Sequence, residues 1–260
     1  MPKSGNDTSV PRVNILGVEV SAVNMAQAIG AISQWIDRNE PHYVCVTPAH
    51  GVMEGRNDPE LRRVFKESGL TTPDGMSIVW LLHWYGQKHV TRVYGPDLML
   101  SLCKYGLSRG WKHYFYGGAS GVPEKLVDNL LKLFPNLQVA GVHSPPFREL
   151  TLEEDENITN QIQAKKPEIV WVGISTPKQE RWMSQHVNTL KVPVLIGVGA
   201  AFDFLSGAKT QAPKWVQRFG MEWLFRLATE PRRLWRRYIH YPAFVFLAIS
   251  QRLGFKRYHV

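Results

Sequence analysis

The sequence predicts an α/β fold, a Rossmann-like and mostly parallel sheet with helices on both faces, followed by a basic helical appendage. Short apolar runs rich in β-branched and aromatic residues alternate with segments of helical length through the first 207 residues. These runs are continuously apolar, which is typical of parallel strands covered on both faces. Beyond residue 207 the composition shifts to basic and aromatic side chains.

Six strands and six helices are expected in the first part of the chain. The strands are Val13–Leu16, Tyr43–Thr47, His113–Tyr116, Leu137–Val142, Ile169–Ile174 and Val194–Val198. The helices lie near Asn24–Arg38, Ser77–Tyr85, Asp97–Arg109, Glu124–Phe134, Leu152–Lys165 and Lys178–Leu190. Ligands of parallel sheets bind beyond the carboxyl ends of the strands. The residues that follow the strands are therefore the candidates for a site.

The charge of the chain is confined to its last part. The 260 residues carry a formal net charge of +9. Residues 208–260 contain 11 Lys or Arg and two acids, Glu222 and Glu230, so they account for this charge alone. We therefore predict two parts, a neutral catalytic core over residues 1–207 and a basic, aromatic-rich appendage over residues 208–260.

Composition leaves three partners open for this appendage. Cations beside Trp and Tyr suit anionic headgroups at a bilayer interface, nucleic acid attracts the same cations, and an arginine-rich helix face can simply be solvated. The apolar run at residues 243–249 is too short to span a bilayer. Met1 to Val10 lacks an apolar signal core, and two cysteines give no disulfide framework, so we expect a cytoplasmic location.

Two glycine runs follow predicted strands. Gly117, Gly118 and Gly121 precede a helix, where they indicate either a cradle for a diphosphate or a tight turn, with equal weight. The run that contains Gly199 lacks the third glycine of a dinucleotide fingerprint and sits in the last strand. It argues against a nicotinamide-dependent oxidoreductase.

Two other segments at strand ends hold polar side chains. Asp74 precedes a predicted helix, where a carboxylate is either a general base or an N-cap, and the residues alone favour the N-cap. Thr176, Pro177 and Gln179 have the spacing of a capping box.

Three arginines of the appendage are candidates for holding a phosphate group. The chain has no Asp-x-Asp pair to hold a divalent metal. Arg226, Arg233 and Arg236 are spaced by seven and three residues, which places them on one helix face only if the helix continues through Pro231. Arginine forks fit phosphate oxygens well.

Taken in order, these segments resemble the WecG/TagA/CpsF family of bacterial glycosyltransferases. The resemblance runs from about Val13 to Tyr241, and its motifs are Thr72-Pro73-Asp74-Gly75, Arg92 to Leu98, Tyr116-Gly117-Gly118, Pro177 to Glu180, Gly197-Val198-Gly199 with Phe202-Asp203, Ala212 to Trp215, Gly220 to Leu224, Arg226-Leu227 and Glu230-Pro231. One departure is Thr47-Pro48-Ala49, where members often have Thr-x-Asn.

The resemblance implies an inverting, metal-independent transfer of a hexose from a UDP-sugar to an undecaprenyl-diphosphate-linked sugar. The reaction would serve cell-surface or exopolysaccharide synthesis at the inner face of the cytoplasmic membrane, with a peripheral enzyme and no cofactor. The implied catalytic or substrate-binding residues are Asp74 as the catalytic aspartate, with Thr47, Arg92 and Gln179. The residues expected at the diphosphate and substrates are Gly117, Gly118, Gly199, Asp203, Arg226, Arg233 and Arg236, the arginines being those of the appendage.

The expected partners are a UDP-sugar, a polyprenyl-diphosphate-linked sugar and an anionic membrane, without nucleic acid. Because Ala49 offers no amide, we expect UDP-glucose to serve at least as well as UDP-N-acetylmannosamine. The alternative is a basic nucleotide- or nucleic-acid-binding α/β protein without transferase activity, which would bind RNA or DNA with steep salt dependence and ignore lipid vesicles. The oligomeric state, a homo-oligomer included, stays open.

Overall fold

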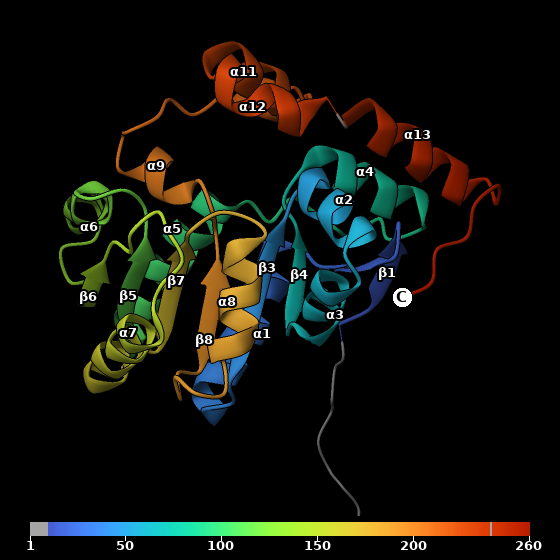
Figure 1. Cartoon of the computed structure of the whole chain (residues 1–260). Coiled ribbons are helices and arrows are strands. Elements are labelled where there is room, and N and C mark those ends of the chain that lie inside the picture. Colours follow the sequence, from blue (N-terminus) through green and yellow to red (C-terminus); the bar gives the residue numbers. More distant parts are fainter. Residues whose placement is uncertain (1–9, 240) are drawn as a thin grey trace, which may run out of the picture.

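A six-stranded parallel sheet with helices on both faces forms the centre of the computed structural model, which describes residues 10–239 and 241–260 (Figure 1). The strand order is β4-β3-β8-β7-β5-β6, and every neighbouring pair is parallel. This confirms the predicted fold class. The strands are β3 (His42–Thr47), β4 (Leu70–Pro73), β5 (Lys112–Gly117), β6 (Gln138–His143), β7 (Ile169–Gly173) and β8 (Val194–Gly197).

The first predicted strand belongs to a separate hairpin. Strands β1 (Arg12–Ile15) and β2 (Val18–Ser21) pair antiparallel, and the turn between them places Leu16 and Gly17 at positive φ. The hydroxyl of Ser21 accepts a hydrogen bond from the backbone N–H of Thr71 at 3.0 Å. The hairpin therefore lies against β4, the edge strand that no apolar run in the sequence revealed.

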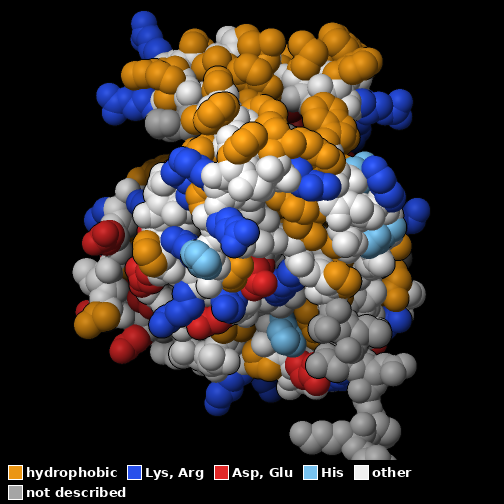
Figure 2. Space-filling model, turned by 90° about the vertical axis from the view of Figure 1, so that its right-hand side faces the viewer, with side chains coloured by type: hydrophobic (Ala, Val, Ile, Leu, Met, Phe, Trp, Pro, Cys, Tyr) orange, Lys and Arg blue, Asp and Glu red, His pale blue; other side chains and the backbone are white. Residues whose placement is uncertain are grey.

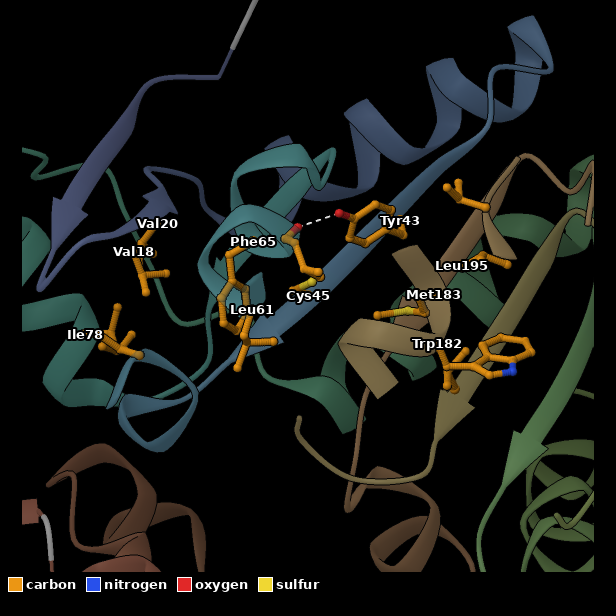
Figure 3. Packing of buried hydrophobic residues seen from close by; sticks show 14 of the residues in the cluster. Val18, Val20, Tyr43, Cys45, Leu61, Phe65, Ile78, Trp182, Met183 and Leu195 are labelled. Carbon is orange, nitrogen blue, oxygen red and sulfur yellow. Dashed lines mark hydrogen bonds between the residues drawn. The ribbon is translucent and has the colours of Figure 1, made fainter. Parts of the chain in front are cut away.

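Side chains of alternating strand residues divide the core into two layers. On one face, α1 (Met25–Arg38), α5 (Gly95–Gly106) and α6 (Val122–Leu133) pack against Phe115 and Trp171. The helices on the other face are α2 (Ala49–Asn57), α3 (Pro59–Glu67), α4 (Met76–Trp84), α7 (Leu152–Lys165) and α8 (Lys178–His186). Figure 3 shows this second layer, in which the Tyr43 hydroxyl donates a hydrogen bond to the carbonyl of Val64.

The appendage is four helices and a tail. They are α10 (Lys214–Arg218), α11 (Glu222–Thr229), α12 (Pro231–Tyr238) and α13 (Tyr241–Arg252). The core also contains two short helices, η1 (Leu107–Arg109) and α9 (Ala201–Leu205). Helix α11 ends one residue before Glu230, and Pro231 opens α12, because proline has no N–H to continue the helix but suits a first turn. Helices α11 and α12 lie above the carboxyl ends of the strands (Figure 1).

The end of the chain returns to the core. Phe244 and Leu247 of α13 are buried in the same apolar cluster as α2 and α3. The side-chain amide of Gln251 accepts from the N–H of Leu16 at 2.8 Å and donates to the carbonyl of Asn14 at 3.0 Å. Residues 208–260 therefore return to the core through α13, and Gln217 of α10 and Glu222 of α11 bond to Arg92 of the core.

Candidate active site

Two cavities meet at the carboxyl edge of the sheet. The larger, about 900 Å³, is lined by the loops after β5, β7 and β8 and by residues of α11 and α12. The smaller, about 340 Å³, lies among α2, α4 and the helices α11 to α13. Pro48, Asp74 and Arg226 line both cavities. Asp74 therefore lies where the two cavities join, with one cation from the appendage beside it.

Asp74 is not the helix cap that its local sequence favours. The N-cap of α4 is Gly75, and no side chain caps that helix. The N–H of Asp74 instead donates to the carbonyl of Thr47 at 3.3 Å, which fixes the carboxyl group beyond the ends of β3 and β4. Burial raises the pKa of Asp74 to about 6, against the opposing effect of Arg92. The carboxyl group is therefore mainly ionised at neutral pH and basic enough to accept a proton.

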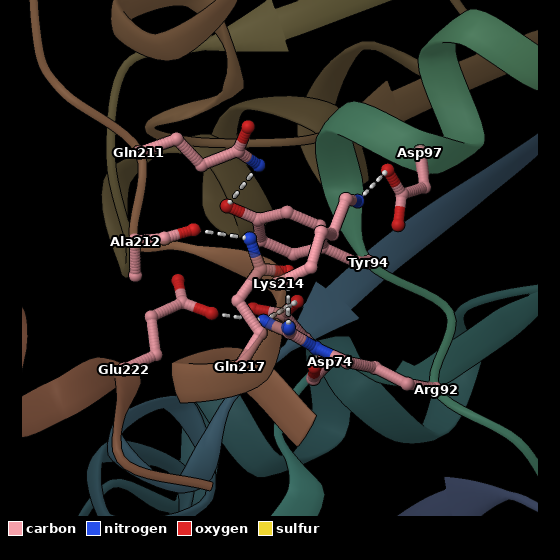
Figure 4. A network of polar contacts seen from close by, with 9 residues as sticks. All are labelled: Asp74, Arg92, Tyr94, Asp97, Gln211, Ala212, Lys214, Gln217 and Glu222. Atoms are coloured by element: carbon pink, nitrogen blue, oxygen red, sulfur yellow. Dashed lines mark hydrogen bonds and ion pairs between the residues drawn. The ribbon is translucent and has the colours of Figure 1, made fainter. Parts of the chain in front are cut away.

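Arg92 connects this aspartate to the appendage (Figure 4). Its Nε donates to the carbonyl of Asp74, and its Nη2 lies 3.7 Å from Asp74 Oδ1 and 2.6 Å from Glu222 Oε2. Its Nη1 donates to Gln217 Oε1 at 3.2 Å. The guanidinium lies 3.9 Å from the centre of the Tyr94 ring. Every nitrogen of this side chain is therefore engaged, and the guanidinium is held in one orientation.

Thr47 and Gln179, both implied by the family resemblance, are buried. The hydroxyl of Thr47 donates to the carbonyl of Cys45 at 3.1 Å and faces neither cavity. Gln179 lines the larger cavity, and its Oε1 accepts from the N–H of Gly199 at 3.1 Å. Thr47 thus contacts Asp74 only through its backbone carbonyl, whereas Gln179 forms part of the wall of the larger cavity.

The capping box expected before α8 does not form. The N-cap of α8 is Pro177, without a side-chain cap. The hydroxyl of Thr176 donates to Glu180 Oε1 at 2.9 Å, and Gln179 Nε2 donates to the same oxygen at 3.0 Å. The polar side chains of this loop therefore form a buried network against the larger cavity.

The glycines have different surroundings. Gly117 has φ of 132°, and a Cβ there would lie 2.5 Å from the backbone of Gly173, so close strand packing explains this glycine. Gly118 and Gly199 also have positive φ, and both line the larger cavity. Asp203, in the same wall, pairs with Lys209 at 2.6 Å.

The three arginines of the appendage are not equivalent. Arg226 of α11 lines both cavities, and Arg233 of α12 lines the larger one. Two nitrogens of Arg233 donate to the carboxylate of Glu230 at 2.6 and 2.7 Å. Arg236 lines neither cavity; it is exposed, 5.4 Å from the centre of the Trp235 ring. The break at Pro231 separates Arg226 from the other two.

One wall of the larger cavity consists of stacked rings. Tyr116 stacks on Trp182 and Trp182 on His186, with 4.4 Å between the centroids of each pair. His186 Nε2 lies 2.7 Å from Asp155 Oδ2. Tyr116 and His186 cover the Trp182 ring and all three side chains are buried, so the stack forms a rigid part of the cavity wall.

The residues that sequence reasoning missed are Glu222, Gln217, Tyr94 and Lys209. Glu222 carried one available signal, since it is one of only two acids in a strongly basic segment. Lys209 gave none beyond its charge. Among residues 10–239 and 241–260 no three His, Cys, Asp or Glu side chains gather closely enough to hold a metal ion.

Comparison with known proteins decides the family. The model of the glycosyl transferase WecG/TagA/CpsF family matches residues 13–258. The chain belongs to this family. A WecG/TagA/CpsF chain is a glycosyltransferase, so the residues around Asp74 form a candidate glycosyl-transfer site.

Several similar proteins are named N-acetylglucosaminyldiphosphoundecaprenol N-acetyl-beta-D-mannosaminyltransferase. The chain is similar to the protein of Bacillus spizizenii (strain W23), 26% identical over 81% of this chain and 80% of that one. It is also similar to those of Bacillus subtilis (strain 168), 24% identical over 88% and 90%, and Staphylococcus aureus (strain MRSA252), 26% identical over 88% and 89%.

The helices of the described part of the chain include none with the length and apolar character needed to cross a bilayer.

Proposed function

We propose that this chain transfers a hexose unit, with inversion, from a UDP-sugar to a sugar carried on undecaprenyl diphosphate. The observation that carries this proposal is the position of Asp74 in the shared wall of two cavities. A transferase must bring two substrates to one reacting centre, and a base at the junction can act on one substrate while the other is held in place.

The larger cavity suits the donor. Gly118 and Gly199 have no side chains, so a diphosphate can approach the backbone there closely, although their N–H groups donate to Gly173 and Gln179. Arg233 and Lys209 provide positive charge in the same cavity. The buried stack of Tyr116, Trp182 and His186 gives this cavity a rigid wall.

The smaller cavity suits the acceptor. Its apolar lining includes Met53, Trp223, Tyr241 and Phe244, which fit a polyprenyl chain near its diphosphate. Arg226 lies at the junction, within reach of phosphates on either side.

The reaction can then be written in one step. An acceptor hydroxyl attacks the anomeric carbon of the donor sugar, and Asp74 takes the proton of that hydroxyl. The bond from the anomeric carbon to the β-phosphate oxygen breaks, and UDP leaves with the bonding electrons. Arg226 and Arg233 stabilise the charge that develops on the leaving diphosphate. Attack from the face opposite UDP inverts the anomeric carbon.

The donor sugar is a separate part of the proposal. Ala49, which stands where relatives often have asparagine, lines the smaller cavity and not the larger one. The missing amide would therefore affect recognition of the acceptor rather than the donor. It is weaker support for a preference between donor sugars. Competition between UDP-glucose and UDP-N-acetylmannosamine at equal concentration distinguishes the two donors. A tenfold preference, about 1.4 kcal/mol, for the acetamido sugar would assign this chain the transfer named in its relatives.

We further propose that the enzyme works as a peripheral protein on an anionic membrane surface. Exposed apolar side chains gather over the appendage, with basic side chains beside them (Figure 2). This face adjoins the smaller cavity through α13, so a lipid-linked acceptor can reach Asp74 without leaving the bilayer surface entirely.

The deciding experiment is a screen of UDP-sugars against N-acetylglucosaminyl-diphospho-polyprenol, with release of UDP as the signal. We expect UDP release that requires both substrates. The Asp74→Asn variant is the matched control, since it preserves size and removes the base. No UDP release with any pair, or full release by the variant, would contradict the proposal.

A further inference from the structure

Glu222 and Asp74 share one nitrogen of Arg92. The Nη2 atom lies 2.6 Å from Glu222 Oε2 and 3.7 Å from Asp74 Oδ1, so the closer ion pair is with Glu222 (Figure 4). All three side chains are largely buried, with 15 to 20% of each exposed. Asp74 directly follows β4 and Glu222 opens α11, so the two carboxylates are nearly 150 residues apart in the sequence.

The remaining contacts of Arg92 come from both the core and the appendage. Gln217 of α10 accepts from Nη1, and the amide of Gln217 donates in turn to the carbonyl of Ala212 at 2.7 Å. The Tyr94 ring lies against the guanidinium. The appendage therefore provides two of the groups that hold Arg92, and the core provides the ring and the carbonyl of Asp74.

Other charges face Asp74 as well. Arg226 of α11 favours its ionised form, whereas Asp97 of α5 and Glu222 oppose it. Across the smaller cavity His50 of α2 lies 3.6 Å from Glu54. Among these groups only Glu222 both competes for the nearest cation and adds a negative charge of its own.

We propose that Glu222 is a positioning residue that holds Arg92 off Asp74, so that docking of α11 on the core keeps Asp74 a competent base. This inference rests on the proposed transferase function. A carboxylate fully paired to arginine is a weak base, and without Glu222 the Nη2 atom of Arg92 has Asp74 as its neighbouring carboxylate. Docking of the appendage thus completes the site and also sets the proton affinity of the base.

The test is the pH dependence of kcat/KM in Glu222→Gln, which is isosteric and retains an oxygen to accept from Arg92. We expect the acidic limb to move downward by about one pH unit, and the plateau to fall roughly 3- to 10-fold because a weaker base accepts a proton less readily. Glu222→Asp keeps the negative charge and should return the acidic limb at least partly to its wild-type position. Glu67 is an exposed acid paired with Arg63 on α3, so Glu67→Gln is the control and should leave the acidic limb and the plateau unchanged.

A second readout is independent of turnover. In protein labelled with ¹³C at the aspartate carboxyl groups, the resonance that disappears in Asp74→Asn reports Asp74, and its titration midpoint should fall in Glu222→Gln. An unchanged midpoint and limb in a normally folded Glu222→Gln protein would overturn the inference. A wild-type protein that releases no UDP would instead contradict the transferase function, while the titration would still test the positioning role.

Discussion

Gln179, in the first turn of α8, bonds to Gly199 in the wall of the larger cavity. Its Oε1 atom accepts a hydrogen bond from the N–H of Gly199 at 3.1 Å, which ties the start of α8 to the loop after β8. Its Nε2 atom donates to Glu180. Both ends of the amide are thus engaged within the protein, so this side chain supports the site before any substrate is bound.

Replacement of Gln179 by leucine should therefore damage stability as well as activity. Leucine is close in size but leaves the N–H of Gly199 without its partner, at a cost of about 1–3 kcal/mol in the free energy of unfolding. We expect a lower melting temperature together with a higher KM for the donor. An unchanged melting temperature with a large loss of turnover would show instead that the amide acts directly on substrate.

Asp74→Asn should give the opposite combination. Loss of the base should lower turnover by roughly 10²- to 10⁴-fold. Burial raises the pKa of Asp74 to about 6, above the ordinary aspartate value of 3.8, so the folded protein binds the additional proton and loses stability as the pH rises from about 4 to 6. The side chain of asparagine does not ionise, so the Asp74→Asn variant does not lose stability over this pH range.

The melting temperature of Asp74→Asn should therefore equal or exceed that of the wild type at pH 8, and the difference should narrow at pH 4. Thermal unfolding at the two pH values checks this, with initial rates of UDP release measured in parallel. Normal turnover in the variant would remove Asp74 from the mechanism.

The sequence predicted the parts of the fold that local pattern determines. The central strands and the helices between them have long apolar or amphipathic patterns, and they form as expected. Strand β4 was missed because its four residues end in proline beside Asp74 and indicate a turn instead. Helices α2 and α3 were missed because Gly51, Gly55 and the Asn57-Asp58-Pro59 break obscure their periodicity.

The site was predictable in part for the same reason. Residues that follow parallel strands must gather at one edge, and this placed Gly118 and Gly199 together, whereas Asp74 was assigned to the site only through the family resemblance, because the strand before it was not predicted. The partners of Arg92 could not be found in this way, because Glu222 lies 130 residues further along and no local pattern encodes that contact. The division among the appendage arginines likewise depends on where α12 begins.

Replacement of the three appendage arginines should reduce activity to different extents. Arg226→Ala and Arg233→Ala each remove a cation from the larger cavity, and each should cost about 2 kcal/mol or more in transition-state stabilisation. Arg236 lines neither cavity, so Arg236→Ala should cost less than about 0.5 kcal/mol on a soluble acceptor. Values of kcat/KM for the three variants provide the test. Equal losses would mean that Arg236 reaches the substrate in the working enzyme.

Metal independence stays a prediction. Since arginines are proposed to stabilise the departing UDP, excess EDTA should change the rate less than twofold. A rate that EDTA abolishes and Mn²⁺ or Mg²⁺ restores would contradict this, and Asp203 and Asp97 would then be the first ligands to replace. Asp203 is already paired with Lys209 and Asp97 with Lys214, which makes either a poor metal ligand in the free protein.

Membrane binding should depend on apolar side chains of the appendage. Phe219 and Phe246 are 68 and 69% exposed, so their replacement by serine leaves the core intact. Burial of a phenylalanine side chain contributes about 1.5–3 kcal/mol, so the double variant should bind anionic vesicles at least tenfold more weakly. Leu133→Ser on α6, 62% exposed in the wild type, is the matched control and should sediment normally.

Shortening the chain from Pro242 would be a poorer test, since Phe244 and Leu247 belong to the core. Equal sedimentation of the double variant and the control would show that charge alone, or another surface, attracts the protein to the membrane.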